Sequence, residues 1–195
     1  MNLQDIINFF DSRAKNWDTV NIQNQQVIDK ILDLSDIKDG ISVLDVACGT
    51  GVLFPDYQKR NANVTGIDIS PEMVKIAKEK YPQYEIICDN AVTYDFGKQF
   101  DRIMVFNAYP HFESPENLIE NIIKSLEIGG RLSIAHGASR EEIQKCHSGE
   151  AKTISLDLPE AEEVAQLLSK YLKIDIIISD SQMYMISGVK EEKSL

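Results

Sequence analysis

Apolar residues recur along this chain in two patterns, one typical of amphipathic helices and one typical of buried strands. Near the start, apolar positions three and four residues apart predict helices over residues 3–14 and 20–34. From residue 42 onward, short apolar runs bounded by turn residues predict strands over 42–47, 63–68, 84–88, 100–106 and 131–136. The first of these runs is apolar on both faces apart from Asp45, as in the centre of a parallel sheet.

Signals for the start and the end of helices fall between these predicted strands. A helix is predicted over residues 51–60, and Ser-Pro-Glu sequences predict further helix starts at Ser70 and Ser114. The pair Gly129-Gly130 predicts the end of the helix that starts at Ser114. Helices therefore alternate with strands through the middle of the chain.

The last part of the chain departs from this alternation. Pro159 predicts the start of a final helix, and apolar runs over 173–179 and 183–189 predict a terminal hairpin. Repeated strand–helix units followed by a hairpin predict an α/β fold. We expect a doubly wound Rossmann-like sheet with helices on both faces and one antiparallel strand.

Composition narrows the class of protein. A chain of 195 residues suits a single domain over residues 1–195, and its net charge of −11 argues against a nucleic-acid partner. The chain does not start like a signal peptide, and no stretch approaches the roughly 18 to 20 apolar residues of a membrane span. Among three cysteines without a CxxC pair, Cys48 and Cys88 are expected to be reduced and buried. We expect a cytoplasmic monomer or homodimer with no membrane partner.

The most informative motif is a glycine turn after the strand predicted at residues 42–47. The sequence VLDVACGTG at 43–51 predicts a buried strand that breaks into this turn. Asp68 follows seventeen residues after Gly51, at the end of the second predicted strand. This layout is typical of a nucleoside-binding βαβ unit.

The charge around this turn is negative. Asp45 lies in the turn region, Asp89 follows the third predicted strand, and no Lys or Arg occurs between residues 42 and 58. A loop that binds a diphosphate would avoid an anion here, whereas a cationic adenosyl cofactor would favour one. S-adenosylmethionine carries a sulfonium and an ammonium but no phosphate. The sequence therefore predicts a methyltransferase that uses S-adenosylmethionine and releases S-adenosylhomocysteine.

The residues around the turn can be given roles. Ligands of a doubly wound sheet bind beyond the carboxyl ends of the strands, where Asp68 can accept hydrogen bonds from both ribose hydroxyls and Asp89 from the adenine amino group. The residues predicted to contact the adenine ring are Ile69, Met73, Asn90 and Ala91. Two alternatives stay open: Asp45 holds the N–H groups of the turn, and Asp68 caps the strand end.

The chain resembles the class I S-adenosylmethionine-dependent methyltransferases over residues 41–190, in particular their small-molecule, UbiE-like branch. The segments that carry the resemblance are VLDVACGTG, VTGIDISPEMV, CDNAVTYDF, FDRIMVFNAYPHF and LEIGGRLSIAHG. The resemblance implies a seven-stranded sheet of order 3-2-1-4-5-7-6 with the last strand antiparallel. It also implies cofactor contacts at Asp45, Ala47, Gly49, Thr50, Gly51, Asp68, Ile69, Asp89, Asn90 and Asn107.

The segment FFDSRAKNWD at residues 9–18 looks like the N-terminal part of small-molecule methyltransferases. There it folds over the cofactor, so the resemblance implies that residues 1–38 form a helical lid and that Trp17 contacts the cofactor. The alternative for Phe10 and Trp17 is ordinary packing in the core.

Methyl transfer requires alignment of the acceptor and exclusion of water, and a base only where the acceptor must lose a proton. The catalytic candidates are His111 after the fourth strand, His136 at the end of the fifth, and the nearby Tyr109. His147 lies in the segment 138–156, where this family often builds its acceptor pocket. The three histidines could be surface or capping residues, could orient or deprotonate an acceptor, or could bind a metal. Their separation along the chain is weak evidence for a metal site, and none is predicted.

We expect a small-molecule acceptor, because little chain remains for a separate recognition domain. The sequence leaves open whether the methyl group goes to oxygen, nitrogen, sulfur or carbon. One rival function is an NAD(P)-dependent oxidoreductase, which would need a third glycine near Phe54 and a turn without Asp45. Another is a non-catalytic cofactor-binding or assembly protein on the same fold.

Overall fold

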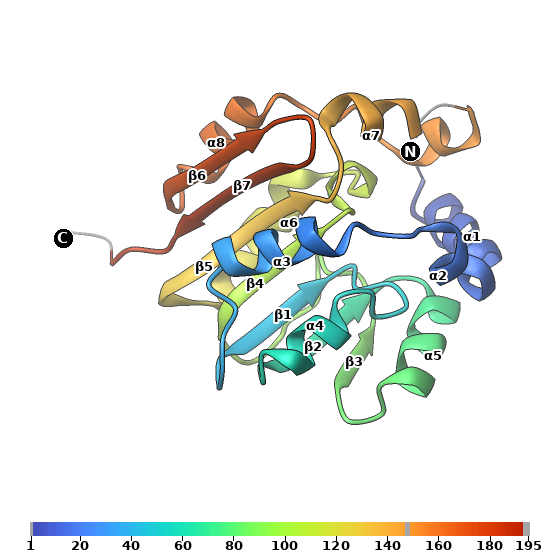
Figure 1. The fold of residues 1–195 in the computed structure, drawn as a ribbon, viewed down its shortest axis with the longest axis horizontal. Helices are drawn as coiled ribbons and strands as arrows, with labels where there is room; N and C mark the ends of the chain where they lie inside the picture. The colour runs from blue at the N-terminus through green and yellow to red at the C-terminus, as the bar shows by residue number, and fades with distance from the viewer. Residues whose placement is uncertain (1, 147–148, 193–195) are drawn as a thin grey trace.

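A seven-stranded sheet forms the centre of the molecule, seen in a computed structural model that describes residues 2–146 and 149–192 (Figure 1). The strand order is β3-β2-β1-β4-β5-β7-β6. Strand β7 is antiparallel to both of its neighbours, and the other strands run parallel to one another. The strands are β1 (Ser42–Val46), β2 (Asn63–Asp68), β3 (Glu85–Cys88), β4 (Phe100–Phe106), β5 (Leu126–His136), β6 (Lys173–Ser179) and β7 (Tyr184–Val189). The predicted doubly wound sheet and its order are confirmed.

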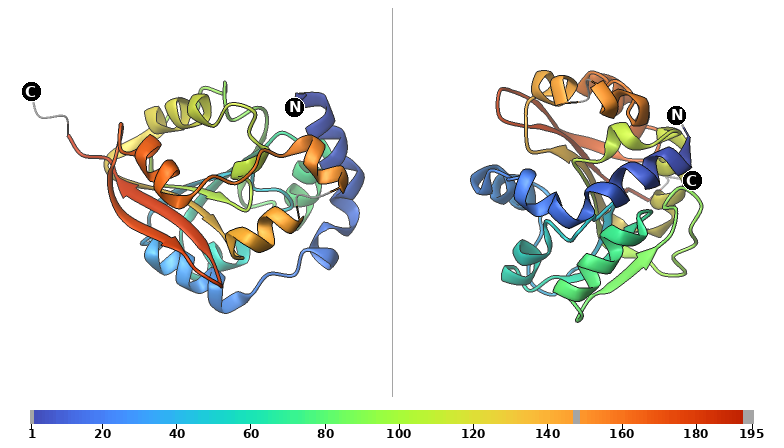
Figure 2. Two further views of the ribbon diagram at one scale, coloured as in Figure 1. Left: turned by 90° about the horizontal axis from the view of Figure 1, so that it is seen from above. Right: turned by 90° about the vertical axis from the view of Figure 1, so that its right-hand side faces the viewer.

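Helices cover both faces of this sheet (Figure 2). One face is covered by α3 (Gln25–Leu34), α4 (Phe54–Lys59) and α5 (Pro71–Lys80). The other face is covered by α6 (Pro115–Ile122) and α8 (Ala161–Leu168).

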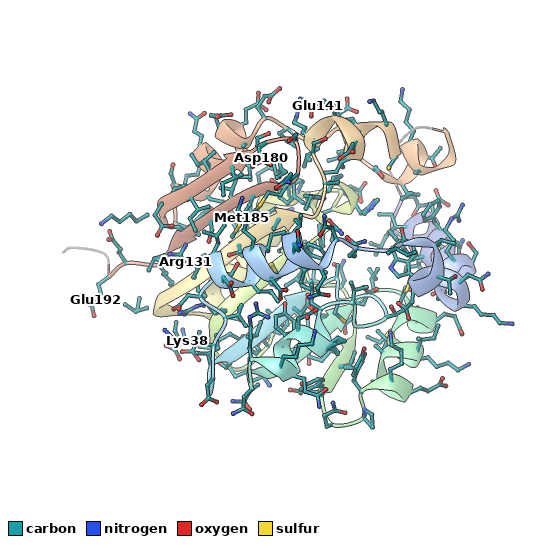
Figure 3. All side chains as sticks on the ribbon, in the orientation of Figure 1. Lys38, Arg131, Glu141, Asp180, Met185 and Glu192 are labelled. Atoms are coloured by element: carbon teal, nitrogen blue, oxygen red, sulfur yellow. The ribbon has the colours of Figure 1, made fainter. Side chains whose placement is uncertain are left out.

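Side chains along β4 alternate between the two faces of the sheet, so this one strand contributes to both apolar cores. Met104 packs in the layer beneath α3, whereas Ile103 and Val105 pack in the layer beneath α6 and α8. The Met185 side chain on β7 is fully buried. By contrast, the charged side chains of Lys38, before β1, and Glu141, after β5, are exposed on the surface (Figure 3). Apolar residues on both faces of the central strands thus produce the two cores expected of a parallel sheet.

Three further helices lie past the carboxyl ends of the parallel strands: α1 (Leu3–Arg13), α2 (Trp17–Val20) and α7 (Arg140–Cys146) (Figure 1). No helix in the described part of the chain is both long enough and apolar enough to cross a bilayer.

The predicted helix over residues 20–34 begins later than expected. Helix α3 starts at Gln25, because the Asn24 side chain accepts a hydrogen bond from the Gln26 N–H at 3.0 Å and caps the helix there. Val20 and Ile22 contributed to the apolar pattern, but their side chains are 71% and 86% exposed. Val20 is the last residue of α2 and Ile22 lies in the connection to α3, so neither belongs to a buried stripe of α3.

Two glycine pairs behave differently from the prediction. The helix predicted over 51–60 is shortened to α4, because Gly51 has a left-handed backbone angle (φ +83°) that a helix does not adopt and residues 51–53 form a turn. Gly129-Gly130 do not end a helix. Helix α6 ends at Ile122, a 3-10 turn follows, and the glycines lie inside β5, which pairs with β4 from Leu126 onward.

Two of the predicted helix starts differ in detail in the structure, and so does one of the two predicted cysteine environments. Ser70 caps α5 as predicted, by accepting from the Met73 N–H at 3.2 Å, whereas Ser114 makes no capping hydrogen bond at α6. Helix α8 begins at Ala161, two residues after Pro159. Cys48 is buried, as predicted, but Cys88 is exposed, because β3 is an edge strand.

Candidate functional site

A cavity of about 1010 Å³ lies past the carboxyl ends of β1, β2 and β4, beneath α1, α2 and α7. Its volume is at the upper end of the range for a single small-molecule site, so it has room for a cofactor and an acceptor together. Thirteen of the predicted site residues line it: Trp17, Asp45, Ala47, Gly49, Asp68, Ile69, Met73, Asp89, Asn90, Ala91, Asn107, His111 and His136. The other three, Thr50, Gly51 and Tyr109, are not among its lining residues.

Asp68 holds the glycine turn in place. Its Oδ2 accepts from the Gly49 N–H at 2.8 Å, and its Oδ1 accepts from the Ser70 N–H at 2.9 Å. Burial raises the pKa of Asp68, while these N–H groups act in the opposite direction. Asp68, not Asp45, is therefore the carboxylate that accepts from the glycine turn, through the Gly49 N–H. Each oxygen keeps a further lone pair for a ligand hydroxyl.

Asp45 lies inside β1, one residue before the strand ends, and not in the turn. It is 2% exposed, and burial together with the nearby negative charge of Asp68 raises its pKa to about 8. The Tyr57 hydroxyl faces Asp45 and acts in the opposite direction, without a hydrogen bond of ordinary geometry. This raised pKa favours the protonated form of the Asp45 carboxyl near neutral pH, whereas the sequence alone suggests a charged carboxylate.

The residues predicted to contact adenine lie on two sides of one end of the cavity. Met73 is 1% exposed in the first turns of α5, and Ala91 is 6% exposed after β3. Asp89 is exposed, and its Oδ1 accepts from the Asn90 N–H at 2.7 Å. The Asn90 side chain in turn accepts from the Val92 N–H at 2.9 Å. These local hydrogen bonds fix the chain after β3 against the cavity.

The N-terminal segment is joined to the glycine turn and to the start of α5 by hydrogen bonds that the sequence did not predict. Asp18 accepts from Thr50 Oγ1 at 2.5 Å and from Lys80 Nζ at 2.8 Å, and Lys80 also donates to the Thr50 carbonyl at 2.9 Å. Farther back in the segment, Asp11 accepts from the Ser70 hydroxyl and the Glu72 N–H at the start of α5. Thr50 therefore holds the segment above the cavity.

Gly51 is required for packing. A Cβ atom added there would lie within 2.9 Å of the rings of Phe54 and Tyr81. Phe54 is fully buried beneath the turn, at the position where a dinucleotide-binding loop would need another glycine.

Aromatic side chains line the cavity on the side of α1 and α2. Phe10 contacts Trp17 edge to face at 5.5 Å between ring centroids, and His111 at 5.0 Å. The Trp17 indole nitrogen lies 4.0 Å from the point where a Cβ of Gly49 would be. Of the two alternatives for Phe10 and Trp17, the structure places both rings on the cavity wall.

The two histidines that line the cavity have different surroundings. His111 ends a short 3-10 helix (Tyr109–His111) and is half-buried, with Nδ1 3.1 Å from the Ile154 carbonyl oxygen. His136 is 2% exposed at the end of β5 and contacts the Tyr184 ring edge to face at 5.8 Å. His147 lies outside the described residues. Within 2–146 and 149–192, no three His, Cys, Asp or Glu side chains are grouped to hold a metal ion.

Tyr109 and Asn107 follow β4, and of the two only Asn107 lines the cavity. Tyr109 is 3% exposed, and burial followed by the charge of Glu116 raises its pKa to about 12, which opposes loss of its proton. Asn107 donates to Gln23 Oε1 at 3.0 Å and accepts from the Gly137 N–H at 2.9 Å. Gln23 is a further lining residue, and no motif marks it in the sequence.

Residues 43–130 match the family described as "Methyltransferase domain". The chain is 28% identical over 137 residues to a demethylmenaquinone methyltransferase of Paenarthrobacter aurescens, covering 67% of this chain and 54% of that protein. The chain spans about half the length of the curated relatives it matches.

Solved structures share the fold at low sequence identity. The N-methyltransferase NodS of Bradyrhizobium japonicum, solved with S-adenosylhomocysteine, superposes with a TM-score of 0.76 at 16% identity. That alignment covers 96% of this chain and 100% of NodS. Magnesium protoporphyrin IX methyltransferase of Synechocystis, solved with S-adenosylmethionine, gives 0.74 at 15% identity over 97% of both chains. In its sheet order, its glycine turn and the family match over residues 43–130, the chain is similar to the class I S-adenosylmethionine-dependent methyltransferases.

Proposed function

We propose that the protein transfers a methyl group from S-adenosylmethionine to a small-molecule acceptor by in-line displacement and releases S-adenosylhomocysteine. The observation that carries this proposal is the set of residues that line the cavity. The glycine turn and the carboxylates Asp68 and Asp89 line it together with aromatic rings and two histidines. A nucleoside and an acceptor can therefore meet in one enclosed space.

The carboxylates and the glycine turn fit an adenosyl group. Asp68 and Asp89 both line the cavity. We propose that Asp68 accepts hydrogen bonds from the ribose hydroxyls and Asp89 from the adenine amino group. The proposed contacts to the rest of the cofactor come from Trp17, Asp45, Ala47, Gly49, Ile69, Met73, Asn90, Ala91 and Asn107. For Thr50 and Gly51 we propose indirect roles, holding the lid and packing the turn.

The lid supplies the conditions that methyl transfer needs. The methyl carbon is already activated by the sulfonium, so the protein has to align the acceptor and keep water away. Residues of α1 and α2 close the cavity on the side opposite the sheet, with Phe10 and Trp17 turned inward. His111 and His136 are the candidates for contact with the acceptor; Tyr109 is not, because it is buried outside the cavity lining.

The relatives support a small acceptor. One is named for demethylmenaquinone and another for ubiquinone biosynthesis. A cytoplasmic monomer or homodimer without nucleic-acid or membrane partners remains part of the proposal, and the net charge of −11 supports the exclusion of nucleic acid.

Calorimetry tests cofactor choice. We expect micromolar binding of S-adenosylmethionine and S-adenosylhomocysteine and none of NAD, because Phe54 takes the place of a third glycine. NAD binding without S-adenosylmethionine binding would contradict the proposal and favour the oxidoreductase.

Transfer of label tests catalysis. Incubation of the protein and methyl-labelled cofactor with the small-molecule fraction of a cell extract should yield a labelled product. Changing His111 and His136 to Ala should slow this transfer and leave cofactor binding nearly intact. Cofactor binding without any transfer would favour the non-catalytic binding or assembly role.

A further inference from the structure

His111 is held by two groups from a segment far along the chain. Its Nδ1 lies 3.1 Å from the Ile154 carbonyl oxygen and 3.0 Å from Ser155 Oγ. A carbonyl oxygen has no proton to give, so the Ile154 contact is a hydrogen bond only when Nδ1 carries the proton. The Ile154 carbonyl therefore selects the Nδ1–H tautomer, and Nε2 becomes the basic nitrogen of the neutral ring.

The same contacts stabilise the protonated form of the ring. When Nε2 takes up a proton, the Nδ1–H group of the imidazolium still faces the oxygens of Ile154 and Ser155. Oxygen atoms that hold an imidazolium in this way orient the base and stabilise the charge that it gains. Phe10 packs edge to face against the ring at 83° and fixes its tilt from the lid side.

The cavity around His111 favours a flat apolar ring. Phe10, Trp17, Phe112 and Ile143 line it together with His111. An imidazole is matched to a phenolic hydroxyl, with a pKa of about 10, far better than to an alkyl alcohol. A neutral amine or a carboxylate attacks without prior loss of a proton and needs no such base.

Building on the proposed methyl transfer, we propose that the acceptor carries an aromatic hydroxyl, that His111 Nε2 removes its proton, and that Ser155 positions His111 for this step. The hydroxyl oxygen forms a bond to the methyl carbon, and the carbon–sulfur bond breaks with its electron pair going to sulfur. The hydroxyl proton passes to Nε2 and then to water. The products are a methyl aryl ether, S-adenosylhomocysteine and one proton.

Nitrogen NMR of the ¹⁵N-labelled protein tests the tautomer directly. With S-adenosylhomocysteine present, His111 should show the Nδ1–H tautomer, its signal being assigned by loss in His111→Gln. Ser155→Thr keeps the hydroxyl and should preserve this signature, whereas Ser155→Ala should shift it. A wild-type His111 in the Nε2–H tautomer would overturn the proposal.

Transfer to three matched probes tests the acceptor. With labelled S-adenosylmethionine, catechol should be methylated and benzylamine and benzyl alcohol should not. Label on the amine or the alcohol alone, or on none of the three, would contradict an aromatic hydroxyl. Loss of S-adenosylmethionine binding in calorimetry would instead refute the proposed function itself.

Kinetics with catechol separate positioning from general stability. His111→Gln should lower kcat at least about a hundredfold, and Ser155→Ala about tenfold, with little change in the KM for S-adenosylmethionine. Ser155→Thr should restore the rate. Ser169→Ala, which removes a hydroxyl that donates to the Gln166 carbonyl on α8, is the control and should leave kcat unchanged. Equal rates for Ser155→Ala and wild type would remove Ser155 from the mechanism.

Discussion

Asp18 accepts a 2.5 Å hydrogen bond from Thr50 Oγ1, which joins the N-terminal helices to the glycine turn. Lys80 at the end of α5 completes the contact, because its ammonium binds both the Asp18 carboxylate and the Thr50 carbonyl. Burial alone would raise the pKa of Asp18, but the Lys80 ammonium and the Thr50 hydroxyl outweigh it and hold that pKa below its ordinary value. The segment that encloses the cavity is thus attached to the turn that borders it.

Asp18→Asn should loosen this attachment. We expect S-adenosylmethionine to dissociate about fivefold faster, the effect of about 1 kcal/mol from a half-exposed ion pair that water screens. Trp17, the single tryptophan of the chain, lines the cavity and reports the change by stopped-flow fluorescence. Asp5→Asn on α1 is the matched control. Identical dissociation rates in the two variants would show that the contact does not hold the lid.

Asp68→Ala should weaken cofactor binding by about 2 kcal/mol, roughly thirtyfold, because ribose hydroxyls and two backbone N–H groups lose their acceptor. Calorimetry measures the affinity, and thermal unfolding shows whether the turn is also destabilised. Asp95→Ala, which removes an acceptor for the Gly97 N–H away from the cavity lining, should leave affinity unchanged. Wild-type affinity in the Asp68 variant would exclude a ribose contact.

Asp45 should lose its proton when the cationic cofactor binds. Its raised pKa, about 8, leaves it mostly protonated at pH 7, and a nearby positive charge lowers the pKa of a carboxyl. Affinity for S-adenosylmethionine should therefore rise with pH up to about 8, where the proton is already lost before binding.

Calorimetry at pH 7 in phosphate and in Tris measures this proton. Release should approach one proton for S-adenosylmethionine and be smaller for S-adenosylhomocysteine, which lacks the sulfonium. Asp45→Asn should abolish the difference between the two ligands. Equal release with both ligands in the wild type would mean that Asp45 does not respond to the sulfonium.

Gly66→Ala should destabilise the fold by about 1–3 kcal/mol through overpacking. An added Cβ would lie 2.8 Å from Cys48 Sγ and 2.9 Å from the Phe54 ring, both packed against β2 beneath the turn. Urea unfolding measures the loss. Adding Cys48→Ala should recover part of it by removing the sulfur, and no recovery would place the strain at Phe54.

Much of the fold could be predicted because its signals are local. The boundaries of β2, β4 and β6 follow from apolar runs that end at turn residues. The start of α5 follows from Ser70 and Pro71 at its first positions. Predictions failed where a local signal had two meanings: Gly129-Gly130 can end a helix or allow an irregular strand, and pairing with β4 decides for the strand.

The site was predicted less completely, because charge and burial depend on neighbours that are distant along the chain. Asp45 has an ordinary sequence context, and only its burial in the folded chain, together with the nearby charge of Asp68, raises its pKa. Lys80 reaches Asp18 across 62 residues, and Ser155 reaches His111 across 44. No periodicity or motif links such pairs.

By itself, then, the sequence determined the order of helices and strands and the identity of the glycine turn, since these depend on backbone preferences and on apolar periodicity within a few residues. Only the tertiary structure decided which carboxylate holds the turn, which one stays protonated, and which histidine has its tautomer selected. Those properties arise from loss of water and from hydrogen bonds between segments that meet only once the sheet has formed.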